Sequence, residues 1–232
     1  MKTGLILASS SPRRSDLLRQ IGAGFEILPT GADENLDNAA DPAEHAATLA
    51  HRKASSVREH IINAANSSMT NNDRALIIGA DTVVVTHGGA ILGKPIDGPS
   101  AEKMLQSLSG GWHEVYTGVA IIELIYNAKE YKKDYAPLCN QHKQYLKHNH
   151  GGLVCCEMTR VKMRGLSAGD IDAYIKTGEP FGKAGAYAAQ GAGALFIERV
   201  EGCYYNVVGL PLHLLHDMLM IMDYDILTQR QG

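Results

Sequence analysis

Short runs of apolar residues alternate along this chain with longer segments in which apolar residues recur every three or four positions. The first pattern is typical of buried strands and the second of amphipathic helices. The expected strands are residues 5–8, 25–29, 76–85, 90–92, 115–123, 157–163, 194–200 and 205–208. The expected helices are residues 12–21, 42–65, 101–108, 168–177 and 211–222. Because strands and helices interleave throughout, the pattern predicts an α/β fold.

Capping and turn residues support several of these boundaries. Ser11 is a natural N-cap before Pro12, which suits the first position of a helix. Ser167 and Asp170 have the spacing of a capping box. The glycine pair at 88–89 predicts a hairpin turn, so antiparallel strands are expected and the sheet should be mixed.

The pattern breaks between residues 126 and 152. This stretch contains five lysines but only one glutamate and one aspartate, and its three histidines follow no standard metal-ligand spacing. We expect a solvated inserted loop within a single domain that spans residues 1–232. A metal site formed by these histidines is the weaker alternative.

Composition and charge narrow the class of protein. The chain has 232 residues, 45% hydrophobic and 20% charged content and a net charge of −3, as in ordinary soluble globular proteins. This charge argues against nucleic-acid binding, which needs a basic surface. No apolar run is long enough for a membrane span or a signal peptide, so we expect a cytoplasmic protein. The four cysteines form no Cys-x-x-Cys pair, and we expect free thiols.

The segment Ser9–Arg14 combines hydroxyl groups, a helix N-terminus and two guanidinium groups. A helix N-terminus offers free backbone N–H groups and a partial positive charge, and guanidinium groups match phosphate oxygens two at a time. A solvated Ser/Arg-rich tail is the alternative, but the position between a strand and a helix favours a polyphosphate site.

Three further segments carry candidate chemistry. Asp81 lies near the end of a buried strand, where a carboxylate can hold a cation or orient water, or simply cap a turn. Lys94 lies on a Gly/Pro turn, either as a charge for phosphate or as a surface residue. The small-residue segment 182–193 leaves Lys183, Tyr187 and Gln190 as its functional side chains, unless it is only a close packing contact.

Together these segments resemble the Maf family of nucleotide pyrophosphatases. The resemblance rests on five motifs in register, and it runs from about residue 5 to 219 without the insertion. The motifs are Ser-Ser-Ser-Pro-Arg-Arg at 9–14, Gly-Ala-Asp-Thr-Val-Val at 79–84, Gly-Lys-Pro at 93–95, Lys-Ala-Gly-Ala-Tyr-Ala-Ala-Gln-Gly at 183–191 and Asn-Val-Val-Gly-Leu-Pro at 206–211.

The resemblance implies an elongated mixed β-sheet with flanking helices and two lobes around a cleft. It implies hydrolysis of a nucleoside triphosphate to the monophosphate and pyrophosphate with a divalent cation, Mg or Mn. It also implies a homodimer, whereas neither a nucleic-acid nor a membrane partner is expected.

The family's functional positions can be carried over residue by residue. Asp81 matches the proton acceptor, and Glu34 and Asp81 match acidic positions linked to the metal or to water. The positions that surround the phosphates are Ser10, Arg13, Arg14, Lys53 and Lys94.

Three positions bear on the choice of nucleotide. Arg13, Thr82 and Gln190 resemble the branch of the family that acts on dTTP, UTP and modified pyrimidine nucleotides. A glutamine amide can both donate to and accept from the edge of uracil or thymine. The alternatives are a pyrophosphatase for 7-methyl-GTP or another purine triphosphate, and a non-catalytic nucleotide-binding regulator of cell division.

Overall fold

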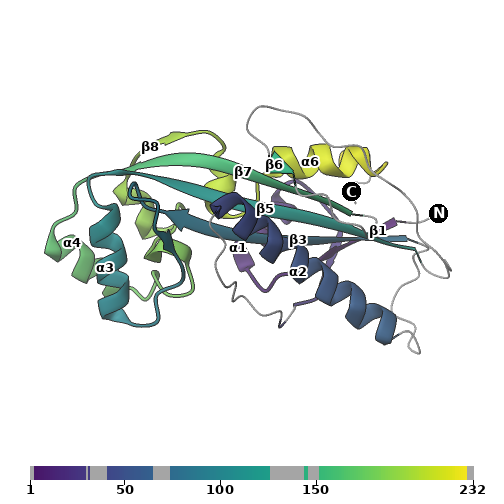
Figure 1. Ribbon diagram of the computed structural model, residues 1–232, viewed down its shortest axis with the longest axis horizontal. Coiled ribbons are helices and arrows are strands. Elements are labelled where there is room, and N and C mark those ends of the chain that lie inside the picture. The colour runs from purple at the N-terminus through teal and green to yellow at the C-terminus, as the bar shows by residue number, and fades with distance from the viewer. Residues whose placement is uncertain are drawn as a thin grey trace.

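A mixed eight-stranded sheet runs along the length of the protein in its computed structural model (Figure 1). The structure describes residues 3–29, 31, 41–64, 74–125, 144–145 and 152–228. The strands are β1 (Thr3–Leu7), β2 (Phe25–Ile27), β3 (Arg74–Val85), β4 (Ile91–Leu92), β5 (Trp112–Ile125), β6 (Gln144–Tyr145), β7 (Gly152–Met163) and β8 (Ile197–Glu201).

The strand order is β2-β1-β3-β5-β7-β6, with β4 paired to β3 and β8 paired to β7. β1 is parallel to both β2 and β3, and the other pairs are antiparallel. This confirms the mixed sheet and the hairpin at 88–89. Because β3, β5 and β7 are much longer than the rest, they extend through the whole molecule.

Helices cover both faces of the sheet at one end of the molecule (Figure 1). The helices are α1 (Pro12–Gln20), α2 (Pro42–Asn63), α3 (Gly98–Leu108), α4 (Ala168–Lys176), α5 (Tyr204–Val208) and α6 (Leu212–Ile221). Leu17 of α1 and Leu215 of α6 pack in one apolar core with Leu76 of β3. Ala50 of α2 packs in a second core with Ile77, the next residue of β3, so α2 covers the opposite face.

A second lobe lies at the other end of the long strands, where Figure 1 shows α3 and α4. Leu105 of α3 and Ile171 of α4 share an apolar core with Val115 of β5 and Val161 of β7. β5 and β7 therefore contribute residues to the apolar cores of both lobes. This arrangement confirms the expected elongated mixed sheet with flanking helices and two lobes.

Glycine allows α2 to lie close against the sheet. A Cβ atom on Gly79 would lie 2.1 Å from the carbonyl oxygen of Ala50, and one on Gly118 would lie 2.3 Å from the backbone of Ala46. Real Cβ atoms do not approach backbone this closely. The two glycines therefore set the distance between α2 and the strands that it covers.

The segment 204–208 differs from the expectation, because it is the short helix α5 and not a strand. Its β-branched residues favour a strand locally. Asn206, however, is fully buried and donates to the Val115 carbonyl at 2.9 Å and to Thr159 Oγ1 at 2.9 Å. These long-range hydrogen bonds override the local preference. Similarly, residues 192–196 form a 3-10 turn, and β8 begins only at Ile197.

The inserted loop expected at 126–152 falls mostly outside the described residues. Within it, the structure describes β6, which pairs with Cys155 and Cys156, and the first residue of β7 at Gly152. No helix among the described residues is long and apolar enough to cross a membrane.

Candidate active site

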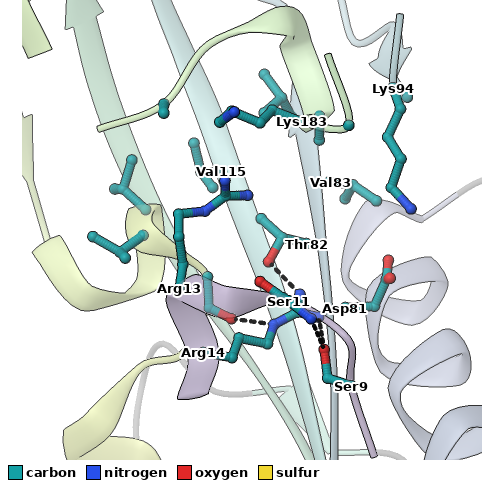
Figure 2. A pocket seen from close by; sticks show the side chains of 18 of the residues that line it. Ser9, Ser11, Arg13, Arg14, Asp81, Thr82, Val83, Lys94, Val115 and Lys183 are labelled. Atoms are coloured by element: carbon teal, nitrogen blue, oxygen red, sulfur yellow. Dashed lines mark hydrogen bonds between the residues drawn. The ribbon is translucent and has the colours of Figure 1, made fainter. Parts of the chain in front are cut away.

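A cavity of about 940 Å³ lies between the two lobes. This is large enough for a nucleotide-sized ligand. It is lined by the β1–α1 connection, one face of α2, the middle of β3, the turn at 91–94 and the segment 181–189. Figure 2 shows that several of the polar side chains that line it point into one space.

The cavity brings together seven of the nine residues expected from the sequence. They are Ser10, Arg13, Arg14, Lys53, Asp81, Thr82 and Lys94. Gln190 is exposed and is not among the lining residues, although its neighbour Ala189 is. Glu34 lies outside the described residues.

Asp81 and Lys53 form a close ion pair at the bottom of the cavity. Lys53 Nζ lies 2.5 Å from Asp81 Oδ1, and the two side chains are only 10% and 12% exposed. Asp81 faces α2 because it lies two residues after Gly79 on the same face of β3. The close approach of α2 at Gly79 therefore brings Lys53 within reach of Asp81.

Arg14 is held by the protein from three directions (Figure 2). Its Nε donates to the Gly209 carbonyl at 2.8 Å, and its two terminal nitrogens donate to Ser9 Oγ at 3.2 Å and Thr82 Oγ1 at 3.1 Å. Arg14 thereby connects α1, β3 and the turn after α5. These bonds fix the position of Thr82, whose hydroxyl also lies 3.0 Å from Thr117 Oγ1.

The hydrogen bonds of Arg14 and Thr117 give the motif at 206–211 a structural role, for which its sequence alone predicted no contact. Gly209 supplies the carbonyl that Arg14 binds, and Asn206 supplies one for the Thr117 hydroxyl at 3.0 Å. Gly209 has φ of 122°, in the region that favours glycine. The turn is therefore part of the scaffold that supports Arg14 and Thr82.

Arg13 and Lys183 lie together on another side of the cavity from Asp81 and Lys94, and the Arg13 side chain points toward Lys183 (Figure 2). Burial lowers the pKa of Arg13 from its ordinary value, whereas Tyr174 and Glu179 act to raise it. Burial and the Arg13 charge lower the pKa of Lys183, with Glu179 opposing them. Both cations are half-buried, so desolvation disfavours their charged forms.

Glu179 organises the segment that carries Lys183. Its carboxylate accepts hydrogen bonds from the Tyr174 hydroxyl at 2.9 Å and from the backbone N–H groups of Ala192 and Gly193 at 3.0 Å. Burial acts to raise the pKa of Glu179, but these hydrogen bonds and Lys183 lower it overall. The Lys183 ammonium group donates to the backbone carbonyl of Glu179.

A buried histidine forms a hydrogen bond with the hydroxyl group of Tyr187, which lines the cavity. The Tyr187 hydroxyl lies 2.7 Å from His113 Nε2, and the two rings pack edge to face. Burial lowers the pKa of His113 to about 4. Neutral His113 therefore holds a residue that lines the cavity. The sequence offered no local signal for Glu179 or His113, because their contacts form only in the folded chain.

The donor set fits a divalent cation that is bound mainly by phosphate and water. Among the described residues, no group of three metal-ligating side chains occurs. Asp81 is nevertheless a buried carboxylate in a cavity that also holds cationic side chains. Mg²⁺ in nucleotide sites keeps several waters and needs only one or two carboxylates beside the phosphates. Asp81 can serve as one of them.

Comparison with known proteins identifies the family of the chain. Residues 4–222 match the family model described as Maf-like protein. The chain is 42% identical over 225 residues to a dTTP/UTP pyrophosphatase from Acetivibrio thermocellus, covering 97% of this chain and 98% of the relative. It is 44% identical over 223 residues to a dTTP/UTP pyrophosphatase from Pelotomaculum thermopropionicum, covering 96% and 98%. A dTTP/UTP pyrophosphatase from Thermococcus kodakarensis is 41% identical over 225 residues, covering 97% and 100%. The chain belongs to the Maf-like protein family, as its motifs predicted.

Proposed function

We propose that this protein is a nucleoside triphosphate pyrophosphatase that hydrolyses dTTP, UTP and modified pyrimidine nucleotides to the monophosphate and pyrophosphate. The observation that carries the proposal is a buried Asp81, paired with Lys53, in a nucleotide-sized cavity that Arg13 and Lys94 also line. The names of the relatives support the choice of substrate.

The arrangement suits attack of water on the α-phosphorus. A P–O bond forms to the water oxygen, the bond from the α-phosphorus to the bridging oxygen breaks, and pyrophosphate leaves. Asp81 accepts the proton of the water as a general base. Because the Lys53 hydrogen bond uses Oδ1, we assign Oδ2 of Asp81 to the water. Catalysis of this kind consists mostly of positioning and charge stabilisation.

The cations in the cavity would stabilise the negative charge that develops on the leaving group. Lys94 lies on the same side of the cavity as Asp81 in Figure 2. Arg13 approaches from α1, whose N-terminus adds a partial positive charge. Ser10 is exposed at the same connection and is proposed to contact a phosphate oxygen. Arg14 is proposed to act here mainly by positioning Thr82, given its three bonds to the protein.

We propose Mg or Mn as the cofactor. Asp81 would hold it together with phosphate oxygens and, by resemblance to the family, Glu34. Such a cation neutralises phosphate charge and lowers the pKa of a bound water.

The base is proposed to be selected by Thr82, Arg13 and Gln190. Gln190 is not among the residues that line the cavity, but it directly follows Ala188 and Ala189, which are, and this neighbourhood supports the proposal. Its amide can donate and accept, as the uracil or thymine edge requires. We also propose a cytoplasmic homodimer with a nucleoside triphosphate as its partner and no role for nucleic acid.

The test is product analysis with a panel of nucleotides in the presence of Mg or Mn. The panel comprises dTTP, UTP, 5-methyl-UTP, CTP, 7-methyl-GTP, ITP and the common purine triphosphates. Formation of the monophosphate and pyrophosphate, preferentially from dTTP and UTP, is the expected result. Preference for a purine would overturn the proposed specificity. Nucleotide binding without turnover would overturn the proposed reaction.

A further inference from the structure

Phe181 is an aromatic residue that lines the cavity and is nevertheless 41% exposed. Tyr187 also lines the cavity, but it is only 5% exposed and its hydroxyl group is bound to His113. His45 lies on α2, the helix that carries Lys53. An apolar ring gains free energy when it is removed from water. Among the residues that line the cavity, Phe181 is therefore the apolar ring available to a ligand.

The backbone turns on both sides of Phe181. Gly178 and Gly182 both have φ of 75°, in the region that favours glycine. The Lys183 ammonium group donates to the Glu179 carbonyl and so closes the turn that contains Phe181. The other lining residues of this segment include four with small side chains, Gly182, Ala184, Ala188 and Ala189. This wall of the cavity therefore combines one large flat ring with small residues that leave room for a ligand.

The Glu179 carboxylate connects the turn of Phe181 to the segment that carries Gln190. It accepts hydrogen bonds from the backbone N–H groups of Ala192 and Gly193, each at 3.0 Å. Phe181 comes two residues after Glu179, and Gln190 comes two residues before Ala192. The aromatic ring and the amide that is proposed to bind the edge of the base are therefore carried by segments that are hydrogen-bonded to each other.

Arg13 approaches the same turn from α1. Its side chain points toward Lys183, which comes two residues after Phe181 (Figure 2). Burial lowers the pKa of both cations, and the negative charge of Glu179 acts to raise it. Asp81, the proposed general base, lies on another side of the cavity. Phe181 therefore belongs to a different part of the cavity from the proposed site of water attack.

We propose that Phe181 is a stacking platform for the nucleobase; this rests on the proposed function and deepens it. Directional hydrogen bonds to the edge of a base require that the plane of its ring is held in place. An aromatic side chain holds that plane, because it contacts a face that every base has. A phosphate has no such face, and the phenyl ring offers it neither a charge nor a hydrogen-bond donor. Phe181 thus supplies affinity for the base, and Gln190 supplies the choice among bases.

Two ligands that differ in the base test the proposal. UMP and ribose 5-phosphate share the sugar and the phosphate, but only UMP has a ring to stack. For Phe181→Ala we expect the dissociation constant of UMP, measured by calorimetry with the full chain, to rise roughly tenfold. That of CMP should rise by a similar factor, because stacking tolerates any base. The constant for ribose 5-phosphate should change by less than about twofold.

Three further variants separate stacking from apolar contact and from folding. Phe181→Trp keeps a flat ring and should bind UMP within about threefold of the wild type. Phe181→Leu keeps an apolar side chain without a flat face and should bind UMP more weakly than either. Leu195→Ala removes an apolar side chain that is 75% exposed and does not line the cavity. It should leave UMP binding unchanged.

Fluorescence of Phe181→Trp gives a signature that a merely structural role would not produce. A base stacked on the new indole ring should quench its emission, whereas ribose 5-phosphate should not. The native chain has one tryptophan, Trp112, which is not among the lining residues. The wild type titrated with UMP therefore supplies the background.

A Phe181→Ala variant with native circular dichroism and unchanged UMP binding would overturn the proposal. So would an equal loss of binding for UMP and ribose 5-phosphate, because the ring would then act on the sugar or phosphate. Absence of UMP binding to the wild type would overturn it as well.

Turnover distinguishes a failure of the stacking platform from a failure of the proposed function. A wild type that hydrolyses UTP, with UMP binding indifferent to Phe181, would refute the platform alone. A wild type that binds UMP through Phe181 but hydrolyses no nucleotide would refute the reaction and support the platform.

Discussion

The carboxylate of Asp81 is the group on which the proposed reaction depends. We expect Asp81→Asn to lower kcat for UTP by about 10²–10⁴-fold, since the amide cannot accept the proton of the water. Nucleotide binding should be kept within a few-fold, because the phosphate-binding cations remain. Steady-state kinetics and calorimetry with UTP would measure the two effects. Asp172→Asn on the exposed face of α4 is the matched control, and near-normal turnover by Asp81→Asn would contradict the assignment.

Gln190 provides a test of specificity at the scale of one side chain. Gln190→Glu replaces the donor half of the amide with a negative charge, so we expect kcat/KM for UTP to fall roughly tenfold. Turnover of 7-methyl-GTP, whose base is cationic, should not fall in parallel. Competition assays with both nucleotides would measure the ratio of the two values. An unchanged ratio would remove Gln190 from base recognition.

Residues whose contacts lie close in sequence, or whose motifs are distinctive, could be predicted before the fold was known. Asp81, Lys94 and the Arg13–Arg14 pair belong to this group. Glu179 and His113 do not, because their functions come from contacts across the fold: His113 meets Tyr187, 74 residues away. The bonds from Arg14 to Thr82 and Gly209 likewise require the completed sheet. Sequence motifs therefore identified the side chains in the cavity better than those that support them.

At the scale of the elements, the close contact between α2 and β3 brings Lys53 beside Asp81, the proposed general base. Gly79→Ala would place a methyl group 2.1 Å from the Ala50 carbonyl oxygen, so α2 must move away from β3. We expect the free energy of unfolding to fall by about 3 kcal/mol. Activity should fall as well, because Lys53 moves away from Asp81. Urea unfolding and UTP turnover would measure these effects.

Gly165→Ala is the control for this substitution, because a Cβ there meets nothing within 4 Å. Its free energy of unfolding should stay within about 0.5 kcal/mol of the wild type. Equal stability of the two variants would mean that α2 does not need the close approach at Gly79.

Most elements followed from periodicity, capping and turn residues. The capping box of α4 and the N-terminal proline of α1 are present as predicted. α5 was not predictable, because its helical form depends on Asn206 hydrogen bonds to β5 and β7. β8 begins later than the pattern predicts, because the backbone at Ala192 and Gly193 turns to donate to the Glu179 carboxylate.

At the scale of the whole molecule, the buried imidazole of His113 makes stability depend on pH. Burial lowers the pKa of His113 from 6.5 to about 4. At pH values between these two, the imidazole of His113 is protonated in the unfolded chain but neutral in the folded chain. This group therefore lowers the free energy of unfolding as the pH falls from about 6.5 to about 4, by about 3 kcal/mol in total. Above pH 6.5 it has no effect.

Urea unfolding at several pH values would measure this dependence. The difference between wild type and His113→Gln should shrink or reverse toward pH 4, because the variant has no group to protonate there. His213→Gln, which changes an exposed histidine on α6, should follow the wild type. Parallel curves for wild type and His113→Gln would show that His113 does not titrate as proposed.

The long strands have a consequence for how the protein opens. β3 and β5 are paired without interruption from Arg74 and Ile125 to Val85 and Glu114, and so pass from one lobe into the other. Both lobes contain part of this one continuous set of backbone hydrogen bonds. We therefore expect separation of the strands in one lobe to disrupt their pairing in the other. Amide protons at the two ends of β5 should therefore exchange with deuterium through the same opening event, with the same dependence on denaturant. The protein should accordingly unfold as one cooperative unit and not as two lobes that open independently.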